Sequence, residues 1–226
     1  METVRILHAD AHVVVAIKPG GLLAVPGRGP EKQDCLMNRV RALFPGCIEY
    51  PAAHRLDMDT SGLMVFGLTG QAYTSLCRQF AERMVEKRYV AELEGDVVGG
   101  QGEISLPFRL DVDNRPRQIY DPEHGKMGLT RWSVLGRERL ELSEQSEQWG
   151  GSARTQTRVE FCPVTGRTHQ LRVHAAHPLG LGCPIVGDRL YGSGVPGDTL
   201  LLHAAYLRFA HPATGEALAF SSLPPF

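Results

Sequence analysis

Two short polar segments carry the residue types that could do chemistry, and the first runs from His54 to Gly62 (HRLDMDTSG). It places an imidazole, a guanidinium and two carboxylates in nine residues that lead directly into an apolar run. Charge placed against a buried strand costs free energy unless it is paired, so this arrangement is typical of a reactive site. The alternative is an ordinary turn, in which Asp, Thr and Ser side chains bond to the backbone, and residue types alone leave both open.

The second segment is Gly166 to His174 (GRTHQLRVH), which has helical character. Arg172 could reach a carboxylate elsewhere in the chain, and such an ion pair would lower the pKa of that acid and keep it ionised. The alternative is an amphipathic helix in which Arg172 is solvated. A metal site of His169, His174 and His177 is not expected, because the H-E-x-x-H spacing is missing and no cysteine pair assists.

Together the two segments resemble motifs of the RluA-type pseudouridine synthases. The first is similar to the family's HRLD-x-x-TSG signature, and the second to its third motif. Three further matches follow in the family's order, namely Lys18-Pro19 with Val25-Pro26-Gly27-Arg28, Lys87-Arg88-Tyr89-Val90-Ala91, and Gly187-Asp188-Arg189-Leu190-Tyr191-Gly192. The ordered set spans about residues 13–211 and is far more specific than HRLD alone. Two features depart from the pattern away from the site: Ile17, where the family usually has Asn, and a longer segment from Arg137 to Ala153.

The resemblance implies an α+β fold, the pseudouridine synthase fold, with a mixed, largely antiparallel β-sheet flanked by helices and a central RNA-binding cleft. It implies that residues 1–226 form this single catalytic domain. The separate amino-terminal RNA-binding domain that many relatives carry is not expected, since the first family motif begins near the start of the chain.

The implied reaction is isomerisation of uridine within RNA: the base leaves the ribose at nitrogen, turns, and reattaches through carbon. Asp57 would carry this reaction, either by attacking the ribose or by removing a ribose proton. Arg172 would pair with Asp57 and hold it ionised, and Asp59 would be structural. Because no atoms are gained or lost, one carboxylate can suffice, whereas a hydrolytic glycosidase usually needs two.

A base inside folded RNA must first be extruded and held against an aromatic ring. By the resemblance, Tyr89 would lie against the flipped uracil and assist removal of the ring proton; its alternative is a cross-strand packing tyrosine. Arg55 would fill the gap left by the base, and Leu171 would pack beneath the uracil. Phosphate contacts are expected from five further arginines, Arg28, Arg115, Arg117, Arg167 and Arg189.

Met58 and residues 114–118 (NRPRQ) are most similar to the RluA subgroup, which modifies position 32 of the tRNA anticodon stem-loop and 23S ribosomal RNA. The expected partner is therefore tRNA, 23S rRNA or both. Modification of another tRNA or rRNA site remains an alternative. A non-catalytic RNA-binding module is another, although the presence of Asp57 with Arg172 argues against it.

The elements that must position these residues follow from hydrophobic periodicity. Strands are predicted at His12–Ile17, Gly62–Leu68, Lys87–Leu93, Thr130–Leu135, Thr155–Phe161 and Leu200–Phe209, and helices at Gly70–Met84, capped by Thr69, and Thr168–Ala176. The glycine-rich connection from Gly95 to Gly102 predicts a strand pair around a loop. The polar segment from Arg137 to Ala153 predicts a surface loop.

Composition bounds the remaining possibilities. The chain has 226 residues, 42% hydrophobic and 22% charged, without an apolar run long enough for a membrane span, which predicts one globular unit. The amino end lacks an export signal, so a cytoplasmic location is expected. The protein is also expected to be a monomer. A formal charge of -1 misses the basic balance typical of nucleic-acid-binding domains. Five scattered cysteines without a C-x-x-C pair predict reduced thiols. No metal or organic cofactor is expected, because the sequence has neither a ligand cluster nor a phosphate-cradling glycine motif and the implied isomerisation needs no redox carrier. A serine hydrolase is excluded because G-x-S-x-G is absent.

Overall fold

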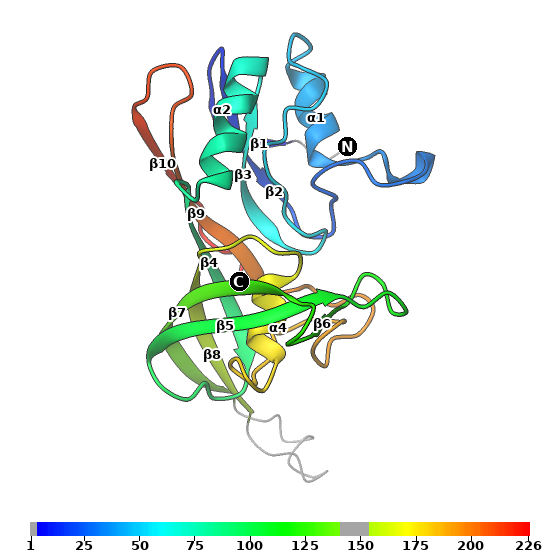
Figure 1. Cartoon of the computed structure of the whole chain (residues 1–226), viewed down its shortest axis with the longest axis vertical. Coiled ribbons are helices and arrows are strands. Elements are labelled where there is room, and N and C mark those ends of the chain that lie inside the picture. Colours follow the sequence, from blue (N-terminus) through cyan, green and yellow to red (C-terminus); the bar gives the residue numbers. More distant parts are fainter. Residues whose placement is uncertain (1–3, 141–153) are drawn as a thin grey trace. The chain divides into compact units, whose positions relative to one another are not determined.

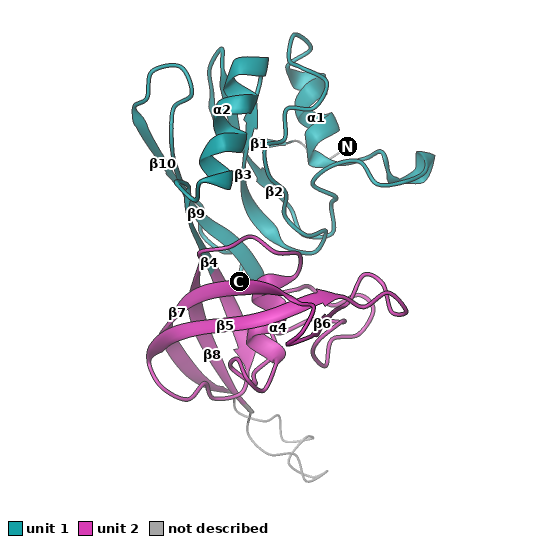
Figure 2. Cartoon of the chain, viewed as in Figure 1, with its two compact units in different colours: residues 1–89, 202–226 teal, residues 90–201 magenta. Residues whose placement is uncertain are grey.

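The computed structural model describes residues 4–140 and 154–226 of the chain (Figure 1). The described chain divides into two compact units, residues 1–89 with 202–226 (unit 1) and residues 90–201 (unit 2), which Figure 2 colours separately. Unit 1 is therefore built from both ends of the chain, and unit 2 is one continuous segment between them.

Unit 1 contains a sheet in the order β1-β2-β3-β9, with β10 paired to β9. Only the β3–β9 pair is parallel; β1–β2, β2–β3 and β9–β10 are antiparallel. Its elements are β1 (Arg5–Ala9), β2 (Val13–Lys18), a 3-10 turn (Pro30–Lys32), α1 (Leu36–Leu43), β3 (Ser61–Gly67), α2 (Gly70–Ala81), β9 (Leu202–Ala210) and β10 (Ala217–Ser221).

The two central strands of unit 1 are buried on both faces, which explains their unbroken apolar sequences. Side chains alternate along a strand, so Val14 and Phe66 pack on one face with Leu36 of α1. Val15 lies in the other cluster, on the opposite face, with Leu76 of α2. The sheet is thus held between one helix on each side.

Helix α2 confirms the predicted helix and its cap. The hydroxyl of Thr69 accepts a hydrogen bond from the backbone N–H of Ala72, as an N-cap residue should. The predicted end at Met84 is wrong, because the helix stops at Ala81 and Arg83 adopts a left-handed conformation with φ of 60°. Met84 is 61% exposed and does not extend the buried face of the helix.

Unit 2 contains strands in the order β4-β8-β7-β5-β6, where residues 90–94 of β4 belong to this unit. The pairs β8–β7, β7–β5 and β5–β6 are antiparallel. Helix α4 adds Val173 to an apolar cluster that contains Phe108 of β5. The elements are β4 (Glu86–Glu94), β5 (Gln101–Leu110), β6 (Gln118–Tyr120), β7 (Lys126–Leu140), β8 (Arg154–Pro163) and α4 (Gln170–Ala176).

The strand pair predicted around the Gly95–Gly102 connection is wrong. β4 lies next to β8, whereas β5 lies between β7 and β6. The connection itself bonds to β8, since the Gly95 N–H donates to the Thr155 carbonyl and the Val97 N–H to the Thr157 hydroxyl, at 2.8 and 3.1 Å. These contacts direct the chain along β8 and away from a tight return to β4.

The surface loop predicted from Arg137 to Ala153 is wrong for its first four residues. β7 continues to Leu140, and residues 137–140 pair with residues 157–154 of β8. The polar composition of this stretch reflects the outer end of a long strand pair. The rest of the predicted loop, residues 141–153, lies outside the described residues.

The other predicted strands and the second helix are confirmed with shifts of at most two residues at their ends, except that the strand predicted at Thr130–Leu135 is the longer β7, which begins at Lys126. Among the described residues, α1, β1, β6, β10 and the 3-10 turn were not predicted, whereas β5 is the strand expected after the Gly95–Gly102 connection. α1 has only eight residues, and its N-cap is Cys35, whose Sγ accepts from the Asn38 N–H at 3.4 Å. A cysteine is not among the residues that mark a helix start in a sequence.

All five cysteines are free thiols. Within residues 4–140 and 154–226, no three His, Cys, Asp or Glu side chains are grouped so that they could hold a metal ion. Of the helices in these ranges, none has the length and hydrophobicity required to cross a membrane.

Two buried histidines should make the protein sensitive to acid. Burial lowers the pKa of His174 in α4 and of His203 in β9 to about 4. In the unfolded chain these histidines bind protons below about pH 6.5, whereas in the folded chain they bind them only below about pH 4. The free energy of unfolding therefore decreases as the pH drops through this window. We expect a loss on the order of 1–2 kcal/mol per histidine between pH 7.5 and 5, measured by urea unfolding.

His174 offers a specific check of this effect. Its two ring nitrogens have no hydrogen-bond partner within the described part of the chain, and the ring lies edge-on to Phe108 at 5.7 Å. His174→Phe removes the titrating group and keeps an aromatic ring, so the variant should lose less stability on acidification than the parent. An equal loss in both proteins would contradict the assignment.

Candidate active site

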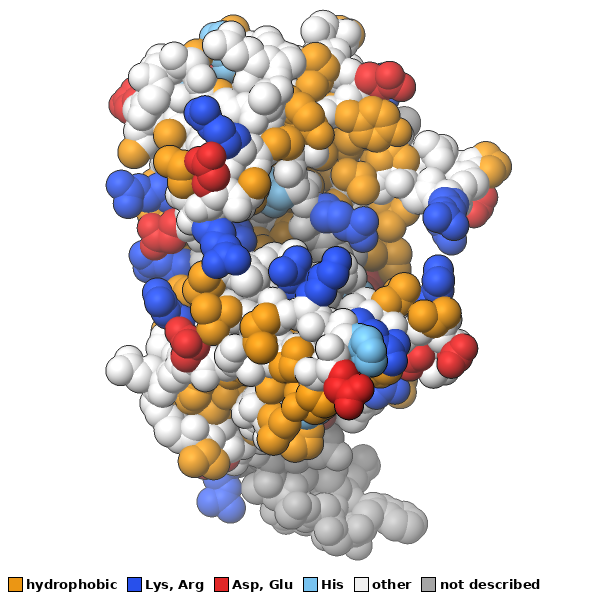
Figure 3. Space-filling model, in the orientation of Figure 1, with side chains coloured by type: hydrophobic (Ala, Val, Ile, Leu, Met, Phe, Trp, Pro, Cys, Tyr) orange, Lys and Arg blue, Asp and Glu red, His pale blue; other side chains and the backbone are white. Residues whose placement is uncertain are grey.

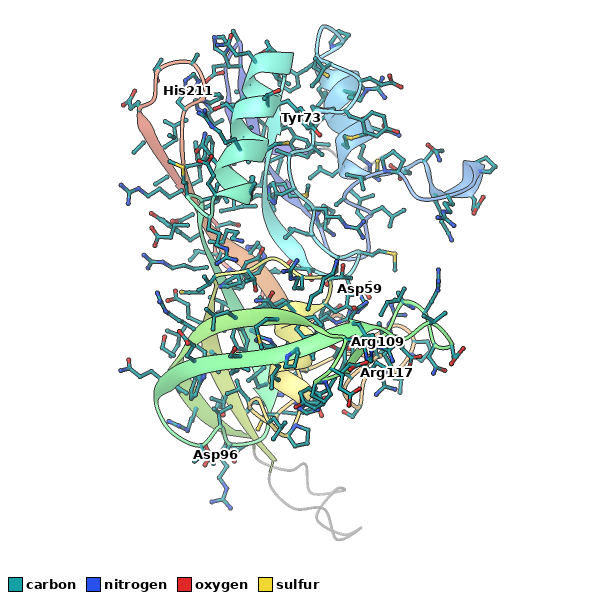
Figure 4. All side chains as sticks on the ribbon, viewed as in Figure 1. Asp59, Tyr73, Asp96, Arg109, Arg117 and His211 are labelled. Carbon is teal, nitrogen blue, oxygen red and sulfur yellow. The ribbon has the colours of Figure 1, made fainter. Side chains whose placement is uncertain are left out.

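The segment His54–Gly62 of unit 1 enters β3 from a loop, which Figure 4 marks by its Asp59 label. The backbone N–H of Thr60 donates to the Asp57 carbonyl at 3.2 Å, which closes a turn around Met58 and Asp59. Asp57 is half-buried, and Arg55 is exposed. The turn interpretation and the site interpretation are therefore compatible, since the turn presents the Asp57 carboxylate at the end of a buried strand.

Gly62 allows this segment to pack closely against β9, which lies far from it in the sequence. It has a φ of 118°, and a Cβ atom there would lie 2.4–2.7 Å from backbone atoms of Ala204 in β9. Next to it, the Ser61 hydroxyl and His203 Nδ1 are 2.8 Å apart. Only glycine permits the close β3–β9 approach that fixes where the loop ends.

His54 anchors the start of the segment. Its Nε2 accepts a hydrogen bond from the Val65 N–H at 3.0 Å, and its ring stacks on Phe80 with centroids 4.4 Å apart. Burial, assisted by the charge of Lys87, lowers the pKa of His54 to about 3. The imidazole is neutral at physiological pH and serves to hold the loop.

Lys18 is a site residue that sequence reasoning left unassigned. It is completely buried, and its Nζ donates to the carbonyls of Pro19, Leu22 and Met58 at 2.8, 2.6 and 2.6 Å. Burial lowers its pKa to about 8, against the opposing attraction of the Asp59 and Asp57 carboxylates. The available signal was a lysine that ends an otherwise apolar strand, VVVAIK.

We expect Lys18→Met to destabilise the protein by about 2–4 kcal/mol, because three buried carbonyl oxygens lose their donor. The loop around Asp57 should loosen with it, since the Met58 contact is lost. Urea unfolding measures the first effect, and hydrogen exchange of residues 57–60 measures the second. Lys32→Met, at an exposed lysine of the same unit, is the control; similar losses in both variants would contradict a special role for Lys18.

Tyr89, on β4, packs against the apolar cluster that includes Leu56. Burial raises the pKa of its hydroxyl, and the nearby Asp57 carboxylate raises it further. Tyr89 and Asp57 therefore belong to the same unit, near enough for the carboxylate charge to act on the phenol. The phenol stays protonated at neutral pH and can donate a hydrogen bond, but it is a poor base.

Arg172 lies on α4 in unit 2 and is only 4% exposed, so the interpretation as a solvated helix residue is wrong. Its Nε and Nη2 donate to the two carboxylate oxygens of Asp188, both at 2.7 Å. Asp188 is fully buried and also accepts from the N–H groups of Leu190 and Tyr191, at 2.9 and 3.1 Å. Asp57 belongs to the other unit, and its pairing with Arg172 stays a prediction.

The remaining predicted residues divide between the units. Leu171 is buried on α4, at 7% exposure. The arginines expected to contact RNA are all exposed, Arg28 and Arg55 in unit 1 and Arg115, Arg117, Arg167 and Arg189 in unit 2. Figure 3 shows Lys and Arg side chains interspersed with hydrophobic ones on the viewed face of each unit. An overall charge near zero thus coexists with local basic surface.

Comparison with known proteins gives a consistent result. The sequence profile described as RNA pseudouridylate synthase matches residues 12–177 of the chain. The dual-specificity RNA pseudouridine synthase RluA of Pasteurella multocida (strain Pm70) is 43% identical over 224 residues, which cover 98% of this chain and 93% of that protein. The protein of the same name from Escherichia coli (strain K12) is 40% identical over 224 residues, with the same coverage.

Solved structures show the same likeness. Human RNA pseudouridylate synthase domain containing 1 superposes with a TM-score of 0.74 at 30% identity, over 99% of this chain and 84% of that one. Human RNA pseudouridylate synthase domain containing 4 gives a TM-score of 0.70 at 25% identity, over 98% and 88%. The predicted α+β fold with a mixed, mostly antiparallel sheet is confirmed.

Proposed function

The chain belongs to the RNA pseudouridylate synthase family, and we propose that it isomerises uridine to pseudouridine in tRNA, in 23S ribosomal RNA or in both. The main support for this proposal is that the chain is 40–43% identical, over nearly its whole length, to enzymes named as dual-specificity RNA pseudouridine synthases. The enzyme class is that of an RNA-modifying isomerase, and the choice of RNA is the part that we propose.

In the proposed reaction, Asp57 is the catalytic carboxylate. In one route Asp57 attacks the ribose carbon and displaces the ring nitrogen, and the ring carbon then attacks the same ribose carbon and releases Asp57. In the other route Asp57 takes a ribose proton as the ring nitrogen leaves and returns it when the ring carbon adds to the sugar. In both routes the ring carbon finally loses its proton and the ring nitrogen that left gains one. The fixed turn around Asp57 supports this role, because a carboxylate held in one position is ready for a reacting sugar.

The extruded base is held in the proposed site by Tyr89 and Leu171. Removing the base from its stack in the RNA costs a few kcal/mol, and stacking against the Tyr89 ring offsets part of this free energy. Because the Tyr89 phenol stays protonated, its assistance in the final step takes the form of a hydrogen bond. Arg55, exposed beside Asp57, fills the gap in the RNA.

Arg172 is proposed to keep Asp57 ionised. Its Nε and Nη2 donate to Asp188, which anchors one side of the guanidinium. A guanidinium with five N–H donors can hold one carboxylate and still donate to another. The exposed arginines Arg28, Arg115, Arg117, Arg167 and Arg189 contact phosphates.

Three further expectations complete the proposal. The family match, residues 12–177, crosses the boundary between the two units, which supports their action as one catalytic domain. The enzyme works as a monomer in the cytoplasm, and sedimentation of the purified protein with localisation of a tagged copy tests both. No metal or organic cofactor takes part, because the isomerisation needs no redox carrier.

The proposal is tested with purified protein and RNA that carries tritium at the uridine carbon where the new bond forms. Tritium release is expected from a tRNA anticodon stem-loop, from 23S rRNA fragments or from both, and it should survive prolonged chelation. Sequencing-based maps of pseudouridine from a deletion strain then identify the sites. No release from any of these RNAs would reject the proposed substrates, and loss on chelation with recovery on adding zinc would reject the metal-free reaction.

A further inference from the structure

The hydroxyl of Tyr191 in unit 2 joins two segments that lie far apart in the sequence. The backbone N–H of Gln118, the first residue of β6, donates to this hydroxyl at 2.7 Å. His169 Nδ1 lies 2.8 Å from the same oxygen. A backbone N–H can only donate, so the hydroxyl accepts a hydrogen bond from Gln118, and it shares a second hydrogen bond with His169 Nδ1.

The His169 contact sets the start of the helix that bears Arg172. His169 is the residue before α4 and has a φ of 56°, a left-handed conformation that costs free energy for a residue other than glycine. Such a conformation persists only where surrounding contacts hold it. The Tyr191 hydroxyl supplies one of these contacts. It acts at His169, which stands three residues before Arg172 in the sequence.

The Tyr191 ring also contacts two arginines. The Cζ of Arg172 lies 5.3 Å from the ring centroid, and the Cζ of Arg117 lies 5.8 Å from it. Both distances are within the range of cation–π attraction. Arg172 is buried and Arg117 is exposed, so one ring contacts both an inner and an outer guanidinium.

Arg117 ends a well-ordered loop between β5 and β6. The Asp111 N–H donates to the Arg117 carbonyl at 2.9 Å, and the Arg117 N–H donates to the Asn114 carbonyl at 2.9 Å. The Asp111 carboxylate accepts from the Asn114 side chain at 2.9 Å. Gln118 follows directly, so the Tyr191 hydroxyl holds the base of a loop that already has internal order, and Figure 4 labels Arg117 on it.

We propose that Tyr191 is a positioning residue that couples the Arg117 loop, residues 111–118, to Arg172. The proposal rests on the function proposed above: RNA bound at the loop steadies Arg117 and Gln118, and through Tyr191 it fixes the start of α4 and the guanidinium of Arg172. Tyr191 itself does not touch the reacting atoms. RNA binding would thus improve the alignment of the catalytic arginine.

The test uses Tyr191→Phe, Arg117→Met and the double variant, with Tyr120→Phe as the control. Tyr120 lies on β6 with its ring 5.0 Å from His177, outside the proposed network. Single-turnover rate constants at saturating enzyme and RNA Kd values are measured separately, so that weak binding is not mistaken for slow chemistry. Hydrogen exchange of residues 111–118 is followed in the protein without RNA.

For Tyr191→Phe we expect a rate constant about tenfold lower, a Kd within about threefold of the parent, and faster exchange in residues 111–118. Arg117→Met should lower the rate constant as well as weaken binding. The double variant should be no slower than the slower single variant, because both changes break one coupling. Tyr120→Phe should match the parent in rate constant and exchange.

If the reductions in rate constant caused by Tyr191→Phe and Arg117→Met multiply in the double variant, the two residues act independently and the proposed coupling is wrong. An Arg117→Met enzyme that binds RNA more weakly but reacts at the parental rate when saturated would also overturn the coupling. Because Arg117 is exposed, its variant keeps the test valid even if Tyr191→Phe folds poorly. An inactive parent enzyme would reject the proposed function instead, and hydrogen exchange would still decide whether Tyr191 orders the loop.

Discussion

Asp57→Ala is expected to abolish uridine isomerisation, leaving less than a few per cent of the parental rate, while the Kd for RNA stays within about tenfold. In the proposed reaction the carboxylate takes part in the chemistry itself, whereas the affinity for RNA is expected to be dominated by contacts between basic side chains and phosphates. Tritium release measures the first quantity, and filter binding of the same RNA measures the second.

Two further variants make this result specific. Asp57→Asn keeps the size of the side chain and removes its charge, so it should be as inactive as the alanine variant. Asp34→Ala, at an exposed aspartate of unit 1 that pairs with Arg39, should retain full activity. Isomerisation above a few per cent in Asp57→Ala would exclude this carboxylate as the essential group.

Arg172→Met is expected to lower the free energy of unfolding by about 3–5 kcal/mol. The substitution leaves the Asp188 carboxylate fully buried without its two guanidinium hydrogen bonds, and an uncompensated buried charge is strongly destabilising. Activity should fall as well, because the guanidinium proposed to hold Asp57 ionised is gone. Urea unfolding near neutral pH measures the stability change.

The cause can be separated from a simple loss of packing. Adding Asp188→Leu to the Arg172→Met variant removes the stranded charge, so the double variant should regain part of the lost stability. Arg131→Met breaks a surface ion pair with Glu103 and should cost less than about 1 kcal/mol. A single Arg172→Met variant as stable as the parent, or a double variant no better than the single one, would contradict the explanation.

The sequence predicted the parts of the fold that depend on local pattern. The apolar runs of β2 and β3 and the period of α2 each reflect burial of one short segment, which periodicity reports directly. The choice of partner strand depends on contacts between distant segments, which periodicity does not report. β4 and β5 follow each other in the chain but have different neighbours, because hydrogen bonds from the Gly95 connection to β8 decide the path.

The candidate site was predicted to a similar degree. Asp57, Tyr89 and Arg172 stand in motifs that name residue types and spacing, and such motifs can be seen in a single sequence. Lys18 and Asp188 stand in motifs too, yet their functions depend on contacts that cross the chain. Lys18 reaches the Met58 carbonyl 40 positions away, and Asp188 reaches Arg172 16 positions away. Spacing along the chain carries no information about such contacts.

The parallel pairing of β3 with β9 also has a consequence for synthesis on the ribosome. Unit 2 is one continuous segment, whereas unit 1 needs residues 202–226 as well as residues 1–89. Ser61 and Gly62 pair with His203 and Ala204, so the segment that holds Asp57 is fixed only once these later residues have been synthesised. We therefore expect a nascent chain that stops short of His203 to lack an ordered Asp57 segment and to leave cellular RNA unmodified.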